Sequence, residues 1–168
     1  MTTLNLRAHK LYSDVKLPTF STRGSACFDI CAYYTSELGY DLWSDDRKGF
    51  IKRHDSNITI HPFQRVLVPT GLILDIPPGY SVRLHSRSGL VWKHGLYLTN
   101  CEGIIDWDYI EPLYVMMTSL SQSPKSINNT DRLCQAELVE KIQYDVIEAK
   151  EPPVQKTERD GGFGSTGT

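Results

Sequence analysis

The sequence lacks most of the features that mark whole classes of protein. No apolar run approaches the ~18 residues that a membrane-spanning helix needs, and the N-terminal stretch has no apolar signal-peptide core. Neither sign of charge dominates, because 18 Lys and Arg stand against 20 Asp and Glu, giving a net charge of -2. A polybasic nucleic-acid-binding protein is therefore disfavoured. We expect a soluble, unprocessed, cytoplasmic protein that binds neither nucleic acid nor a membrane.

Metal-binding patterns are missing as well. The two nearest cysteines stand in a C-x-x-x-C spacing, and the five histidines never pair at a spacing typical of metal ligands. We expect no structural metal site, and four reduced, buried thiols that pack as small hydrophobic side chains. The four are Cys27, Cys31, Cys101 and Cys134.

Helical periodicity is scarce, and the best candidate for a short helix is 90–94. Apolar residues instead recur at every second position over short stretches that Gly and Pro separate, which is the pattern of β-strands. A chain of 168 residues is enough for one domain. The sequence predicts an all-β fold, an antiparallel jelly-roll or β-barrel-like sandwich with at most one short helix. The alternating stretches are Val66–Val68, Leu72–Ile76, Ser81–His85 and Gly95–Leu98.

Two segments differ in composition from the rest. Residues 37–57 mix acidic and basic side chains with Tyr40, Trp43 and Phe50, which indicates a surface insertion, either a loop or a hairpin. Residues 151–168 begin with two prolines after Glu151 and end in a glycine-rich run with almost nothing apolar to bury. We expect residues 1–150 to form the folded domain and residues 151–168 to be a flexible C-terminal arm.

Two stretches carry groups suited to phosphate. His85–Leu90 places a guanidinium, two hydroxyls and a glycine backbone in one turn, a composition that suits phosphate oxygens. Residues 162–167 match the glycine spacing of a dinucleotide-binding fingerprint, but the chain ends where that motif needs a helix. The glycine backbone and Arg159 are still suited to wrapping around a phosphate, although a disordered tail is the commoner explanation of such a run.

A pair of carboxylates is the candidate for acid-base chemistry. Asp106 and Asp108 share one face if the backbone is extended there, and one of them would serve as a general base. Two solvated aspartates in a turn are the alternative.

Five short stretches follow one another in a distinctive order: Ala26–Ala32, Arg87–Gly95, Asn100–Tyr109, Asp131–Gln135 and Arg159–Gly167. This order resembles the five motifs of the trimeric deoxyuridine triphosphate nucleotidohydrolases, or dUTPases. The likeness covers about Leu17 to Gly167. Three departures stand out: Cys27 replaces a glycine, Ile110–Pro112 replace an Arg-Gly-Glu, and Arg159 lies one residue nearer the glycine pair than usual.

This resemblance implies hydrolysis of dUTP to dUMP and pyrophosphate by in-line attack of water on the α-phosphorus, with Mg²⁺ on the triphosphate. That activity keeps uracil out of DNA and supplies dUMP for thymidylate synthesis. It also implies a homotrimer with shared active sites and an arm that closes on the bound nucleotide.

The resemblance assigns a role to each motif residue. Asp106 would be the general base, and Asp29 and Gln135 would contact waters on Mg²⁺, with Gln135 also near the substrate. Asn100 and the backbone of Gly103, Ile104 and Ile105 would read the uracil edge, while Tyr109 would stack on the deoxyribose. The phosphates and the base would be held by Arg87, Ser88 and Gly89, and in the arm by Arg159, Phe163, Gly164, Ser165 and Thr166.

Other functions stay open at this stage. The main alternative is a dUTP-binding regulatory module that engages a partner protein through residues 37–57, and turnover distinguishes the two because a sensor need not release pyrophosphate. A jelly-roll surface protein would not need the phosphate-binding residues. A dCTP deaminase of the same architecture is opposed by the Asp106-Trp107-Asp108-Tyr109 pattern.

Overall fold

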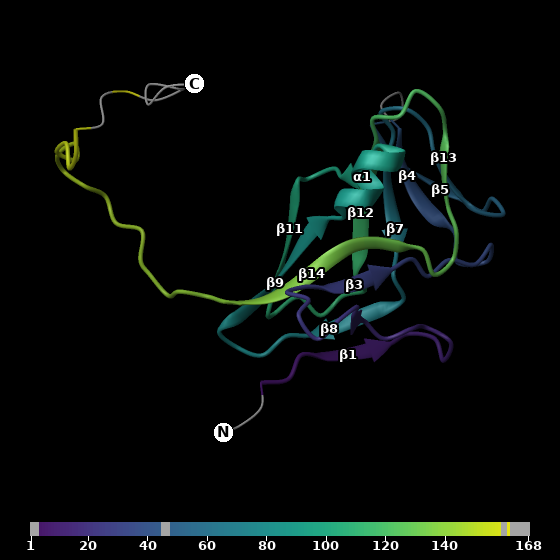
Figure 1. Cartoon of the computed structure of the whole chain (residues 1–168), viewed down its shortest axis with the longest axis horizontal. Helices are drawn as coiled ribbons and strands as arrows, with labels where there is room; N and C mark the ends of the chain where they lie inside the picture. Colours follow the sequence, from purple (N-terminus) through teal and green to yellow (C-terminus); the bar gives the residue numbers. More distant parts are fainter. Residues whose placement is uncertain (1–3, 45–47, 159–160, 162–168) are drawn as a thin grey trace.

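The protein is an antiparallel β structure with one short helix among the residues that the structure describes, which are 4–44, 48–158 and 161 of the computed structural model (Figure 1). In chain order the elements are β1 (Arg7–Lys10), β2 (Thr19–Phe20), β3 (Phe28–Cys31), β4 (Tyr40–Ser44), β5 (Gly49–Arg53), β6 (Ile58–Ile60), β7 (Arg65–Pro69), β8 (Leu72–Asp75), β9 (Tyr80–Ser86), α1 (Ser88–His94), β10 (Leu96–Leu98), β11 (Glu102–Asp106), β12 (Tyr114–Ser119), β13 (Lys125–Ile127) and β14 (Arg132–Glu140).

Two large sheets organise these strands. One has the order β11-β9-β14-β3-β2 and the other the order β10-β12-β7-β4-β5, and two-stranded sheets join β1 to β8 and β13 to β6. Neighbouring strands pair antiparallel in all of them. The predicted all-β, antiparallel jelly-roll class with one short helix is therefore confirmed.

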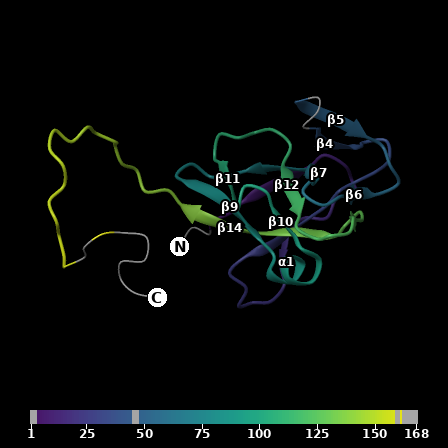
Figure 2. The ribbon, with the colours of Figure 1, turned by 90° about the horizontal axis from the view of Figure 1, so that it is seen from above.

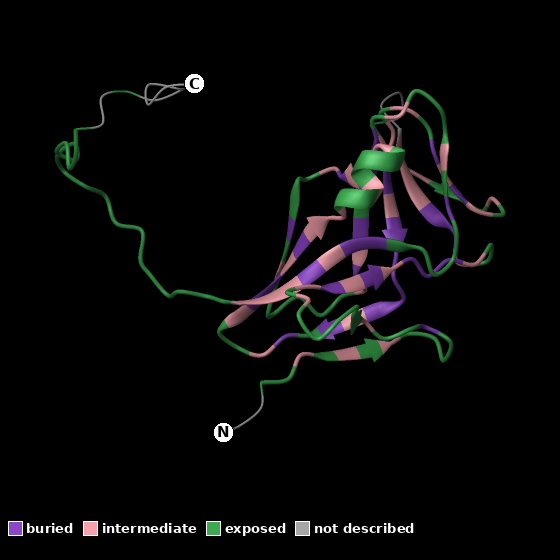
Figure 3. Ribbon diagram, in the orientation of Figure 1, coloured by how far each residue is buried: buried purple, intermediate pink, exposed green. Residues whose placement is uncertain are grey.

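The core lies between these sheets and follows the alternation of the sequence. In β7, Val66 and Val68 are buried while Leu67 between them is partly exposed, and Val82 and Leu84 of β9 are buried in the same way. Buried residues accordingly concentrate on the strands, whereas α1 and the C-terminal segment are exposed (Figure 3). Removal of this apolar surface from water is the main force that holds the fold together.

The short helix begins directly after β9. Arg87 has an extended backbone at the N-cap, and the helix ends at His94 and is capped by Gly95, which has a left-handed φ of 68°. A side chain at Gly95 would be strained by that φ and would also approach the Ser121 backbone nitrogen at 3.0 Å. The helix includes the predicted turn at 90–94 and places Ser88 and Gly89 at its exposed start.

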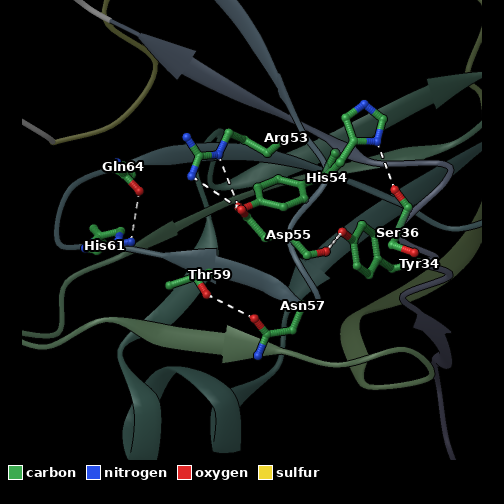
Figure 4. Close-up of polar contacts among 10 residues, drawn as sticks. Tyr34, Ser36, Arg53, His54, Asp55, Asn57, Thr59, His61 and Gln64 are labelled. Atoms are coloured by element: carbon green, nitrogen blue, oxygen red, sulfur yellow. Dashed lines mark hydrogen bonds and ion pairs between the residues drawn. The ribbon is translucent and has the colours of Figure 1, made fainter.

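Residues 37–57 form a hairpin that extends a core sheet. Strands β4 and β5 pair with one another, and β4 also pairs with β7. At the base of the hairpin, Tyr40 is buried and its hydroxyl donates to Asp55 Oδ2 at 2.9 Å. The same oxygen accepts a hydrogen bond from Arg53 Nε at 3.1 Å (Figure 4). The Tyr34 hydroxyl donates to the Asp55 carbonyl. The base of this segment is thus integrated into the fold, and only its distal part stands on the surface.

The chain leaves the sheet after Glu140. Residues 141–158 are exposed, have no regular secondary structure and run away from the β-sheet body (Figures 1 and 2). This exposed stretch nevertheless carries large apolar side chains, namely Ile142, Tyr144, Val146, Ile147 and Val154. Nothing in the described part of the chain is a helix long and apolar enough to cross a membrane.

Candidate active site

The first part of the site is the turn between β9 and α1. Ser86 ends the strand, Arg87 caps the helix, and Ser88 and Gly89 are exposed at the helix start. The first amides of an α-helix have no carbonyl partner within the helix, so they are oriented toward an external acceptor. Three of the predicted phosphate-binding residues, Arg87, Ser88 and Gly89, thus lie together on one turn.

A carboxylate fixes two guanidinium groups beside this turn. Asp29 Oδ1 lies 3.1 Å from Arg87 Nε, and Asp29 Oδ2 lies 3.1 Å from Arg132 Nη1. The Ser21 hydroxyl also donates to Asp29 Oδ2 at 3.1 Å, and Arg87 Nη1 donates to the Arg132 carbonyl at 3.4 Å. The Asp29 side chain is only 10% exposed, so both cations are oriented by a carboxylate shielded from most of the solvent.

Gln135 is brought to the same place by the sheet. It pairs with Asp29 across β14 and β3, next to an irregularity in the strand between Arg132 and Cys134. Residues that are far apart in the sequence, Asp29, Arg87 and Gln135, therefore converge on one surface.

The residues of this surface fit water-mediated contact with Mg²⁺ rather than direct coordination. Both oxygens of Asp29 already accept hydrogen bonds from guanidinium groups. In the part of the chain that the structure describes, no group of three or more His, Cys, Asp or Glu side chains is arranged to hold a metal ion. A Mg²⁺ ion keeps several of its waters readily, so one carboxylate and one amide suffice as outer-shell partners.

The second part of the site is the hairpin of β10 and β11. Asn100 lies in its turn, and Gly103 is buried where an added Cβ would approach the Leu84 side chain at 3.0 Å. Glycine thus allows β11 to pack closely against β9. Along the same strand Ile104 is 54% exposed and Ile105 packs on the core, so the backbone of the predicted uracil-reading stretch is firmly placed.

Asp106 is the last residue of β11 and is exposed. The extended backbone on which a shared face of Asp106 and Asp108 depended is absent, because the chain turns at Trp107 and Asp108 lies in that turn. Tyr109 follows, with its amide donating to the Asp106 carbonyl and its hydroxyl to the Pro112 carbonyl, each at 3.1 Å. Asp106 therefore stands at the end of a strand, whereas Asp108 belongs to the turn that follows.

Within one chain the candidate general base lies far from the phosphate turn, although the start of β11 is close to that turn. In the pairing of β11 with β9, Asp106 faces Ser81, whereas Arg87 lies beyond the opposite end of β9. Six residues of strand separate Ser81 from Arg87, which is about 20 Å at the usual strand rise. The candidate base does not reach the phosphate-binding turn of its own chain.

The predicted arm residues Arg159, Phe163, Gly164, Ser165 and Thr166 lie outside the described residues. Their predicted roles are neither supported nor opposed by the geometry.

The cysteines depart in part from expectation. All four are free, as predicted, but only Cys134 is buried, while Cys27 and Cys31 are partly exposed and Cys101 is exposed in the β10–β11 turn. Burial raises the pKa of the Cys134 thiol to about 12. This thiol is inert at neutral pH and packs as a small apolar group.

Two members of the site were not predicted. Arg132 lies in the fourth motif-like stretch, three residues before Gln135, and this position could have indicated that it belongs to the site. Ser21 lies outside every motif, and its contact with Asp29 joins residues that only the pairing of β2 with β3 brings together.

Taken together, the antiparallel fold, the clustered guanidiniums at a helix start and the exposed carboxylate at a strand end define a β protein built to handle phosphate groups.

Comparison with known proteins identifies the family to which this β protein belongs. The dUTPase family model matches residues 49–167. A deoxyuridine 5'-triphosphate nucleotidohydrolase of Finegoldia magna is 38% identical, covering 92% of this chain and 94% of the relative. One of a Hydrogenobaculum species is 34% identical over 98% of this chain and 99% of the relative. The chain belongs to the dUTPase family.

Solved structures agree on the fold. A mutant dUTPase of Staphylococcus bacteriophage 80alpha superposes with a TM-score of 0.76 at 18% identity, covering 99% of this chain and all of the other. A dUTPase of Streptococcus mutans gives a TM-score of 0.65 at 22% identity over 84% of this chain and 98% of the other. At these identities the likeness supports the fold alone.

Proposed function

We propose that this chain hydrolyses dUTP to dUMP and pyrophosphate. The observation that carries the proposal is the convergence of Asp29, Arg87 and Gln135 on one surface in a chain of the dUTPase family. These residues come from three separate motif-like stretches, and antiparallel pairing in one sheet is what unites them. Because the substrate is a deoxynucleotide made inside cells, the proposal places the protein in the cytoplasm.

In the proposed mechanism the phosphate turn binds the triphosphate. Arg87 and the backbone amides of Ser88 and Gly89 lie where the pyrophosphate accumulates negative charge as it departs. Asp106 accepts a proton from the attacking water while that water forms a bond to the α-phosphorus and the bond to pyrophosphate breaks. Mg²⁺, when bound to the triphosphate, supplies positive charge, and Asp29 and Gln135 would hold its waters.

Selection of the base and sugar is assigned to the β10–β11 hairpin. Asn100 and the backbone of 103–105 would pair with the uracil edge, and Tyr109 would lie against the deoxyribose. The close packing of Gly103 on Leu84 supports this assignment, because a firmly placed backbone edge matches one pattern of donors and acceptors. A mismatched base would leave buried polar groups unpaired, at a cost of about 1–3 kcal/mol each.

We also propose a homotrimer with shared active sites. The separation of Asp106 from Arg87 along β9 supports this proposal, because a base from a second copy would complete the site. The exposed apolar side chains of residues 141–147 support the same proposal, since they bury little of their surface in their own chain. A groove of about 450 Å³ lined by Leu4, Leu17 and Phe20 is a matching apolar surface for them. The arm residues 159–166 would then close over a neighbouring site.

The test is pyrophosphate release measured in parallel with dUTP, dCTP, dTTP and UTP. The proposal expects release from dUTP alone at low micromolar enzyme, because the hairpin pairs with uracil and excludes a 2'-hydroxyl. Ammonia release from dCTP would instead identify a deaminase.

A protein-binding role for the β4–β5 hairpin is the second candidate. Its Trp43 and Phe50 rings pack at 5.3 Å, the Arg65 guanidinium lies 5.3 Å from the Trp43 ring, and Phe50 is 61% exposed. Aromatic and arginine side chains of this kind are typical of interface hot spots. Retained hydrolysis with loss of a binding partner, after removal of the hairpin tip, is the outcome that supports it.

A further inference from the structure

Ser21 contacts the candidate site, but the proposed mechanism gives it no role. Its hydroxyl donates to Asp29 Oδ2 at 3.1 Å, and the same oxygen accepts a hydrogen bond from Arg132 Nη1 at 3.1 Å. The other oxygen of Asp29 accepts one from Arg87 Nε, also at 3.1 Å. Of these three donors, Ser21 alone carries no charge, so its contact is not explained by ion pairing.

Arg132 is a weak anchor for the carboxylate. Its side chain is 53% exposed, against 22% for Arg87 and 10% for Asp29. Water competes for a guanidinium that is exposed to this extent, and a long side chain loses much freedom when it is held in one geometry. Ser21 is exposed as well, but its short side chain has far less freedom to lose. The hydroxyl is therefore the donor that fixes the Oδ2 side of the carboxylate.

The backbone of Ser21 is held on both sides. Before it, β2 pairs with β3, and the rings of Phe20 and Phe28 meet edge to face with their centres 5.8 Å apart. After it, the chain closes into a turn, in which the Thr22 and Ser25 hydroxyls lie 3.0 Å apart and the Ser25 amide donates to the Thr22 carbonyl at 3.2 Å. The hydroxyl is thus presented to the carboxylate from a fixed backbone.

The orientation of the Asp29 carboxylate affects the rest of the site. Hydrogen bonds between a carboxylate and a guanidinium are strongest when the two planar groups are aligned, so the carboxylate sets the direction of Arg87. It also sets the face that Asp29 turns toward Gln135, its partner across β3 and β14. A carboxylate that rotated would loosen both relations, because partners of this kind hold the contacting groups in place.

We propose that Ser21 is a positioning residue, whose hydroxyl fixes the Asp29 carboxylate and, through it, the direction of Arg87. The consequence for binding of dUTP rests on the proposed function. Fixing of the carboxylate does not, because it requires only residues of the protein itself.

The first measurement is the exchange of the Arg87 Nε proton with solvent, followed by NMR without nucleotide or metal and assigned by comparison with Arg87→Lys. Ser21→Ala removes the hydroxyl. The matched control is Ser123→Ala, because Ser123 is exposed and its hydroxyl lies 3.4 Å from that of Ser121. We expect exchange about fivefold faster in Ser21→Ala, the scale of one lost hydrogen bond, and less than twofold faster in the control. Ser21→Thr keeps a hydroxyl and should restore the original rate.

The second measurement is calorimetric titration with a non-hydrolysable dUTP analogue, with the Tm measured on the same samples. Ser21→Ala is expected to raise the Kd of the analogue about fivefold, because Arg87 is less well oriented toward the phosphates. The Tm should stay close to that of the original protein, since the lost contact lies on the surface.

Equal exchange rates in Ser21→Ala and Ser123→Ala would overturn the positioning role, as would failure of Ser21→Thr to restore the original rate. Faster exchange together with a clearly lower Tm would also overturn it, because Ser21 would then support β2 in general. Faster exchange with an unchanged analogue Kd would remove the consequence for substrate binding. Faster exchange in a protein that does not hydrolyse dUTP would leave the positioning role standing and remove the proposed reaction.

Discussion

Asp29 is the side chain on which three other members of the site converge. It accepts hydrogen bonds from two guanidiniums and a hydroxyl while remaining largely shielded from water. Without the carboxylate, Arg87 and Arg132 would repel one another at short range. Asp29 therefore sets the spacing of the cations before any phosphate arrives, in addition to its proposed contact with metal-bound water.

Exchange of Asp106 tests the assignment of the general base. Asp106→Asn removes the proton acceptor but keeps the size of the side chain, so we expect turnover to fall by ~10²-fold or more. Binding of dUTP, measured by calorimetry, should change little. Asp108→Asn is the matched control, because Asp108 lies in the turn beyond the strand, and it should keep turnover within a few-fold of the original. Near-normal turnover in Asp106→Asn would assign the base to another residue.

Asp55 anchors the β4–β5 hairpin through a side-chain network. Its pKa is lowered from the ordinary value, first by the hydrogen bond from Tyr40 and then by that from Arg53. A lowered pKa in the folded state gives stability that is present above the ordinary carboxyl pKa and is lost as the pH falls through the lowered one.

We therefore expect Asp55→Asn to lower the Tm at pH 7 and to lower it progressively less toward pH 3, as the original carboxylate takes up its proton. Thermal melts at both pH values measure this difference. A Tm difference of the same size at pH 7 and pH 3 would show that the anchor does not depend on the charge of Asp55.

The distal part of the same hairpin should be separable from hydrolysis. Replacement of residues 43–50 by a two-residue turn removes Trp43 and Phe50 but keeps buried Tyr40, so we expect nearly unchanged dUTP turnover and a small change in Tm. Removal of the whole of 38–56 takes Tyr40 out of the core and should destabilise the fold. A large loss of turnover in the shorter deletion would mean that the hairpin tip supports the site.

Secondary structure could be predicted from the sequence where it depends on a local pattern, such as the alternation of apolar and polar residues. Alternation predicted β7, β8, β9 and β10, and the candidate helical turn at 90–94 lies in α1, the one helix of the described residues. The attachment of Tyr40 to Asp55, and of Ser21 to Asp29, depends on which strands pair, and no local pattern encodes that choice. A shared face for Asp106 and Asp108 required an extended backbone, and the sequence pattern did not reveal that the chain turns at Trp107.

At the scale of the whole molecule, the distance between Asp106 and Arg87 predicts complementation between chains. Neither Asp106→Asn nor Arg87→Ala should be active alone, yet a refolded mixture should recover part of the activity, because some sites then combine an intact base with an intact phosphate turn. Pyrophosphate release from the mixture measures this. Absence of any recovery, together with a fully active monomer in sedimentation, would contradict shared sites.

Truncation of the chain after Gln155 tests the arm. Residues 156–158 are exposed and lie outside every helix and strand, so the Tm should change little. Turnover should fall by about 10²-fold, the scale of a lost set of phosphate donors. Equal turnover in the truncated and full-length proteins would remove the proposed closing role of residues 159–166.

The exposed apolar stretch at 141–147 also bears on how the protein is handled after synthesis. A newly made chain that has not met its partners displays extended backbone and apolar side chains together, which is the form that proteases cleave and chaperones hold. Burial in an assembly would protect that stretch. The lifetime of the chain in a cell would then depend on how quickly copies find one another, so that scarce chains are cleared and abundant ones persist.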